Sequence, residues 1–125
     1  MNQIIRSFIC ASAVTEFALV AIDSAGKVAI ATDPTANTII GVAQRAADAG
    51  DPVDVVIFGE TRVIANGSLT LTSNTVLAVA ADGEVQAAVS THYPVGFTLP
   101  NVNQTSASAN EQIIICFQRG LAPLA

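Results

Sequence analysis

The sequence is short of charged and aromatic side chains. Of its 125 residues, 12% are charged and 5% are aromatic, and there is no tryptophan. Charged residues supply about a quarter of an average globular chain, so the surface of this protein is unusually poor in charged groups. Hydrophobic residues reach 51%. We therefore expect part of the apolar surface to be buried against other subunits.

Basic residues are scarcer still. Five Lys and Arg stand against ten Asp and Glu, which gives a net charge of −5, and the five are scattered along the chain. Proteins that bind nucleic acid cluster Lys and Arg against the phosphates, so no nucleic-acid partner is expected. No apolar run approaches the roughly 20 residues of a membrane-spanning helix, so no membrane partner is expected either.

Residues that carry chemistry are also few. His92 is the single histidine, and its loop position favours a structural role over that of a catalytic base. Asp48, Asp51 and Asp54 could line a weak calcium site, but they lack the spacing of a calcium-binding loop, and we favour a solvated acidic loop. We predict no catalytic residue, no metal site and no cofactor. The chain is not expected to be an enzyme.

The chain has two cysteines, Cys10 and Cys116, and both lie within apolar segments. Two cysteines in a chain of this size do not make a disulfide framework. We favour buried free thiols that pack as small hydrophobes. A bridge between the two remains open if the terminal strands are neighbours.

The sequence is rich in short runs of β-branched residues separated by turn residues. Leu19–Ile22 and Val28–Ala31 flank a turn that contains Gly26, which predicts a hairpin. Helical periodicity is thin. The sequence therefore predicts an all-β domain that forms a compact barrel or sandwich.

The stretch from Ile39 to Val63 predicts two further strands around a polar link. Pro52 lacks an N–H and fixes φ, so it belongs at the start of the second strand. Gly59 interrupts that strand and suits a bulge. Residues 62–71 predict a separate strand, broken by the turn dipeptide Asn66-Gly67.

The first hairpin has a second version later in the chain. The segments LVAIDSAGKVAIA and LAVAADGEVQAAV share a strand, a turn of Asp, Ala and Gly, and a strand that begins with Val. Val95-Gly96-Phe97 then repeats Ile40-Gly41-Val42, and Ile113–Phe117 repeats Val55–Phe58. We predict an internal duplication of two similar β-units.

The order and spacing of these segments resemble those of the capsid cement proteins of bacteriophages, which are small head-decoration proteins. The resemblance covers about residues 13–117 and is carried by Leu19-Val20, Gly26-Lys27-Val28, Gly41-Val42-Ala43, Ala49–Val55, Gly59, Ala81–Val85 and Val95-Gly96. It implies a β-rich homotrimer on the outer surface of the virion, bound to the major capsid protein and bracing the shell. The alternative is another virion or surface β-module, such as a tail, spike or adhesion domain.

The expected domain organisation is an N-terminal arm over residues 1–18 and one β domain over residues 19–125, with the duplicated units at 19–63 and 76–117. The arm carries four large apolar side chains, which are Ile4, Ile5, Phe8 and Ile9. We expect them to contact a neighbouring subunit or the capsid protein, through a strand added to an exposed sheet edge.

Overall fold

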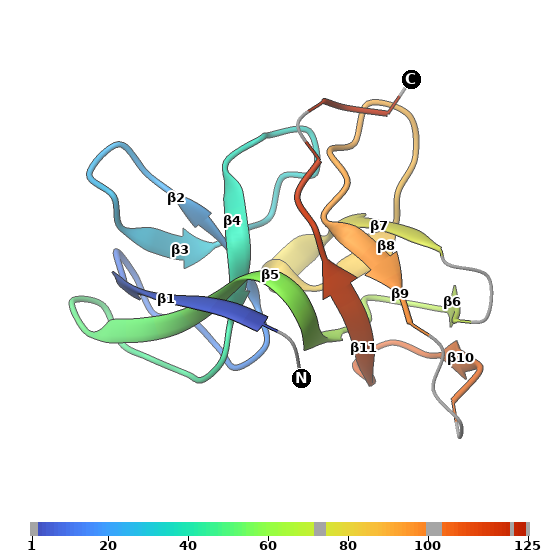
Figure 1. The fold of residues 1–125 in the computed structure, drawn as a ribbon, viewed down its shortest axis with the longest axis horizontal. Coiled ribbons are helices and arrows are strands. Elements are labelled where there is room, and N and C mark those ends of the chain that lie inside the picture. Colours follow the sequence, from blue (N-terminus) through green and yellow to red (C-terminus); the bar gives the residue numbers. More distant parts are fainter. Residues whose placement is uncertain (1–2, 72–74, 100–103, 121, 125) are drawn as a thin grey trace.

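The computed structural model describes residues 3–71, 75–99, 104–120 and 122–124 (Figure 1). The described residues contain eleven strands, a single 3-10 turn and no α-helix. The elements are β1 (Gln3–Ile9), β2 (Leu19–Ile22), β3 (Val28–Ile30), β4 (Ile39–Ala43), β5 (Pro52–Ile64), β6 (Leu69–Thr70), β7 (Val76–Val79), η1 (Ala81–Gly83), β8 (Val85–Ala87), β9 (Gly96–Thr98), β10 (Ser106–Ala107) and β11 (Gln112–Phe117). The all-β prediction is confirmed. Within these residues, no helix is long and apolar enough to span a bilayer.

Nine of the strands form one antiparallel sheet that curls into a half-barrel (Figure 1). Its order is β3-β2-β4-β5-β11-β9-β7-β8, and β1 adds to β5. The two remaining strands, β6 and β10, form a small sheet of their own. Figure 1 shows two lobes, one built by β1–β4 and the other by β6–β11, with β5 running from one to the other.

The strand β5 is long because Gly59 does not end it. It runs for 13 residues, and Gly59, with φ of 112°, pairs both with Gln3 of β1 and with Phe117 of β11. Glycine reaches positive φ without the steric cost that a Cβ brings, so the ladder continues through this residue. The prediction of a separate strand beginning at Arg62 is therefore wrong, because Arg62 belongs to β5.

The strand order of the sheet is symmetric. A hairpin stands at each end, β3-β2 at one and β8-β7 at the other. In both lobes a hairpin is followed by a strand that carries a glycine, and then by a longer strand. The hairpin strand pairs with that glycine in the same way, Val20 with Gly41 and Leu77 with Gly96. The pairings β2·β3, β2·β4 and β4·β5 thus correspond to β7·β8, β7·β9 and β9·β11.

The strand β1 has its counterpart in the second part of β5. The residues that follow these strands are Cys10 and Ala65, and each donates its N–H to a carbonyl across the ladder. The partners are Asp51 at 2.9 Å and Glu111 at 2.8 Å. Each residue also forms a parallel bridge to the second strand of its own hairpin. The equivalent strand pairings of the two lobes therefore include β1.

We call residues 3–58 the first half and residues 59–117 the second half. Their strand pairings are equivalent, whereas a duplication of the sequence over 19–63 and 76–117 stays a prediction. The segment expected to be an arm contains β1, which pairs with Pro52–Gly59 of β5 in the same chain. The strand addition that we expected on another subunit is thus made within the chain.

Gly41 and Gly96 occupy the same position in the two halves, and both are glycines for the same steric reason. A Cβ on Gly41 would overlap the carbonyl oxygen of Val56 in β5, and a Cβ on Gly96 would overlap the carbonyl oxygen of Cys116 in β11. Glycine in a strand interior often marks such a close approach of another backbone.

Two apolar clusters form the core. The first lies within the first half and contains Cys10, Val14, Val20, Val28, Ala43, Val53 and Val55. The second contains Leu19, Ala31, Ile39, Val42, Val63, Ala65, Leu69, Leu71, Leu77, Val79, Val85, Val95, Ala107, Ile113, Ile115 and Phe117. Because four of these residues belong to the first half, the second cluster also packs the two halves against each other.

Candidate interaction surface

Four large apolar side chains are exposed along β1 and the adjoining part of β5. The exposed fraction is 55% for Ile4, 49% for Ile5 and 42% for Ile9, and it is 48% for Phe58, which pairs with Ile4. Single exposed hydrophobic residues are ordinary on a protein surface. We call these four residues on two paired strands the β1 patch, in which Ile4 and Phe58 face each other across the ladder and Ile5 and Ile9 take the alternate positions of β1. Exposed apolar residues in such number mark a candidate surface for binding other proteins.

A shift in register accompanies the exposure of two consecutive isoleucines. Ile4 pairs with Phe58 and Ile5 with Val56, so Ile57 of β5 has no partner residue on β1. Neighbouring residues of a regular strand point to opposite faces, whereas a bulge re-aims the side chains around it. The extra residue of this bulge lies in β5, so the bulge alters the alternation of β5 and leaves Ile4 and Ile5 as consecutive residues of β1.

Polar contacts hold β1 to β5 near both ends of the patch. The Ser7 hydroxyl donates to Asp54 Oδ1 at 2.7 Å, and Gln3 Nε2 donates to the carbonyl of Glu60 at 2.7 Å. Within the described strands, β5 is the partner of β1 and the opposite side of β1 is a sheet edge. Sheet edges of this kind can accept a strand from another chain.

Phe8 differs from the other three residues expected to contact a partner. It is half-buried and packs against the first apolar cluster, with the Arg6 guanidinium 5.5 Å from the centre of its ring. Ile4, Ile5 and Ile9 are open to solvent. Contact of these residues with another chain stays a prediction. The three isoleucines are available for it, while Phe8 anchors the strand.

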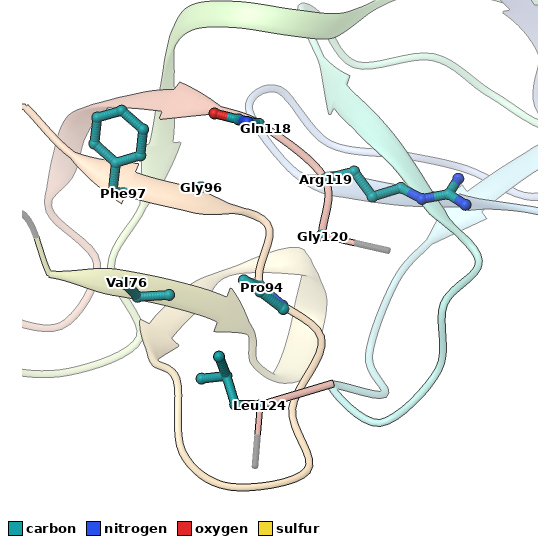
Figure 2. A pocket seen from close by; sticks show the side chains of 8 residues that line it. All are labelled: Val76, Pro94, Gly96, Phe97, Gln118, Arg119, Gly120 and Leu124. Atoms are coloured by element: carbon teal, nitrogen blue, oxygen red, sulfur yellow. The ribbon is translucent and has the colours of Figure 1, made fainter. Parts of the chain in front are cut away.

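The second half and the C-terminal residues that follow it form an apolar pocket of about 310 Å³ (Figure 2). Its lining residues are Val76, Pro94, Gly96, Phe97, Gln118, Arg119, Gly120 and Leu124. The Arg119 guanidinium extends away from Val76 and Pro94 in Figure 2. This pocket could not be predicted from the sequence, because its apolar residues are indistinguishable by type from those of a core strand.

The residues considered for chemistry do not converge. Nδ1 of His92 accepts a hydrogen bond from the N–H of Val89 at 3.3 Å, within the turn that follows β8. Among the residues that the structure describes, no three His, Cys, Asp or Glu side chains gather as a metal site requires. Asp48, Asp51 and Asp54 therefore give no geometric support to a calcium site.

Cys10 and Cys116 are both free thiols. Cys10 is 1% exposed, whereas Cys116 is half-buried. Burial raises the pKa of the Cys10 thiol, and the nearby negative charge of Asp51 adds to the effect. A thiol that stays protonated is a poor nucleophile, so Cys10 serves the core as a small hydrophobe.

The fold is thus a two-lobed, curled antiparallel sheet with an apolar strand on its surface. A solved structure of similar fold is the crystal structure of the head fiber gp8.5 N base in bacteriophage phi29. It matches with a TM-score of 0.69 and 18% sequence identity, over 99% of this chain and 99% of that chain. No protein-family model and no curated protein matches the sequence. At this identity the likeness establishes a shared fold.

Proposed function

We propose that this chain is a head-decoration protein of a bacteriophage. It binds the outer surface of the capsid as a homotrimer and acts as cement, holding neighbouring major capsid proteins together. The observation that carries the proposal is the likeness to the phage head fiber base, which extends over 99% of both chains. A match of whole chains supports the role more strongly than a shared hairpin would.

The physical character of the chain agrees with this role. A cement protein needs a stiff core, apolar surface for its partners and no attraction for packaged DNA. The curled sheet, the exposed isoleucines of β1 and the net charge of −5 meet these needs. Its effect on the shell is mechanical, and we expect no catalytic turnover and no cofactor.

The β1 patch is the surface that we assign to the capsid. Ile4, Ile5 and Ile9 offer apolar area, and Phe58 extends it onto β5. Hot spots of protein interfaces are large side chains buried at the centre of the contact. Phe8 contributes by fixing β1 on the core, so its loss would disturb the patch indirectly.

Binding to stripped heads tests this assignment. Replacing Ile4 and Ile5 by serine should weaken co-sedimentation with heads by about tenfold or more, because two anchors of the contact are lost. Val89→Ser is the matched control, since Val89 is 57% exposed and lies in the second half. Equal binding by the double variant and the control would remove β1 from the capsid contact.

A second candidate is a host-facing spike or adhesion module. The name of the similar structure, a head fiber base, favours it, because a base can carry a fibre without bracing the shell. Binding of the purified chain to host cells or glycans, with no effect on the opening of the shell, would support this second role.

A further inference from the structure

The two halves of the chain contact each other through two different faces. Because the strands of the two halves are equivalent, each half carries a version of both faces, and one version of each face takes no part in the contact. In the first half, the face that receives the second half is formed by Ala18, Leu19, Ile39 and Val42, and we call it the docking face. All four are at most 3% exposed. Leu19, Ile39 and Val42 belong to the second cluster, and Ala18 lies against Gly83 of η1, so the second half covers all four.

The second half meets the docking face with a covering face formed by Val79, Gly83, Val95 and Phe117. All four are buried, and three share the second cluster with Leu19. The turn at Gly83 lies closest. A Cβ added to Gly83 would stand 2.9 Å from the Ala18 Cβ and 3.1 Å from Cγ2 of Ile30.

Polar contacts join the two halves beside these apolar faces. The N–H of Tyr93 donates to the carbonyl of Pro34 at 2.8 Å, and Gln44 Nε2 donates to the Thr61 hydroxyl at 3.1 Å. Thr61 is 1% exposed, so this bond satisfies a buried polar group. The contact is thus a packed interface with satisfied polar groups.

The second half carries its own version of the docking face, and no other half of the chain covers it. The registers of β7 and β9 make Thr75, Val76, Pro94 and Phe97 the counterparts of Ala18, Leu19, Ile39 and Val42. Val76 is 44% exposed where Leu19 is 0% exposed, and the other three are half-buried. The apolar pocket of Figure 2 lies on this free docking face, framed by the C-terminal residues Gly120 and Leu124.

The first half likewise carries a version of the covering face that no other half of the chain covers, although Ile40 and Ile57 in it pack against the first cluster. Its residues are Ile22, Gly26, Ile40 and Ile57, the counterparts of Val79, Gly83, Val95 and Phe117. The three isoleucines are half-buried and Gly26 is exposed. A Cβ added to Gly26 meets no described atom within 4 Å, in contrast to one added to Gly83.

We infer that the free docking face of one copy receives the free covering face of a second copy. The contact between chains then repeats the contact that already joins the halves within each chain. The partner is a second copy of this chain for a structural reason. The free docking face is the counterpart of a face that the chain already covers with its own covering face, and every copy carries a free version of that covering face. Such a head-to-tail contact is heterologous, and it ends in a ring when the rotation between copies closes.

This inference rests on the self-association in the proposed function and names the surfaces that make it. Three chains in a closed ring would present six similar halves in succession. Every docking face would then be covered, including the pocket. The exposed isoleucines of β1 are not among the residues of either face.

Charged variants on the two free faces test the inference by sedimentation velocity of the full chain. Val76→Arg alters the docking face and Ala25→Arg the covering face, next to Gly26. Each should weaken association by about a hundredfold and leave monomers, because the interface would bury an unpaired charge. Ala109→Arg, at an exposed turn on neither face, should associate as the original chain does. Circular dichroism and the melting temperature establish that each variant is folded. If Val76→Arg does not fold, Val76→Ser is tested in its place.

Mixing the two variants gives the sharpest result. Val76→Arg keeps an intact covering face and Ala25→Arg an intact docking face, so an equimolar mixture should form a dimer that grows no further. A contact that uses the same patch on both copies would give no such rescue. Unchanged association of either folded variant, or a mixture that stays monomeric, would overturn the inference.

Protection of heads is measured separately. If wild-type chains associate through these faces but do not stabilise heads, the proposed function fails and the inference stands. If wild-type chains stabilise heads while both variants associate normally, the inference fails and the function stands.

Discussion

Gly83 lies against the carbonyl of Leu19, and an added Cβ would come within 2.9 Å of that oxygen. Gly26 is its counterpart in the first half, with a similar backbone, φ of 78° against 73°. A Cβ added there meets no described atom within 4 Å. The same turn is therefore packed in one half and open in the other.

This difference predicts unequal effects of the same substitution. Gly26→Ala should lower the free energy of unfolding by about 1 kcal/mol, because alanine at positive φ is strained. Gly83→Ala carries the same strain and also a clash with Ala18 and Leu19, which should bring the loss to about 2–4 kcal/mol. Urea denaturation of the two variants measures the difference. Equal losses would mean that η1 does not pack on the first half.

Alanine should be costly at both strand glycines because they occupy equivalent positions, and at Gly96 the positive φ of 151° adds strain. Gly41→Ala and Gly96→Ala each force a Cβ into the carbonyl of the adjoining strand, so each should cost about 1–3 kcal/mol or more. Gly67→Ala is the control, since no described atom lies within 4 Å of its added Cβ. Its effect should stay within about 0.5 kcal/mol. A tolerated alanine at Gly41 alone would show that the two halves are not equivalent there.

Stability at alkaline pH should depend on Cys10. Burial raises the pKa of its thiol in the folded chain, while the unfolded thiol titrates near its ordinary pKa of about 8.5. The folded state therefore holds the proton more tightly. The resulting stabilisation is complete below about pH 8.5 and is lost as the pH rises through the folded-state pKa.

Urea denaturation between pH 7 and 10 measures this slope. Cys10→Ala should flatten it at a lower overall stability, because the variant removes the titrating group and some packing. A steep alkaline loss that persists in Cys10→Ala would assign it to other groups.

Local chemistry made the hairpins predictable. Turns of Asp, Ala and Gly between β-branched runs place β2–β3 and β7–β8 where the sequence predicts them. Pro52 begins β5, as its missing N–H requires. The continuation of β5 was not predictable, because a glycine at this position can end a strand or carry it through. Only its pairing with both Gln3 and Phe117 decides between the two.

The surfaces were less predictable than the strands. The apolar residues of β1 were expected to need a partner, but the sequence does not say that β5 supplies the backbone pairing. Leu19 and Val76 are apolar residues at equivalent positions, one buried and one exposed. The second half packs on Leu19, whereas no further half packs on Val76. The difference is therefore set by the tertiary packing.

Thermal release of DNA from phage heads tests the proposed cement function most directly. Binding across capsid boundaries stabilises the closed shell by mass action. Heads stripped of this chain should therefore release DNA at a lower temperature than intact heads, and adding the purified chain back should restore the original temperature. If stripped, restored and intact heads all open at the same temperature, the chain is not cement.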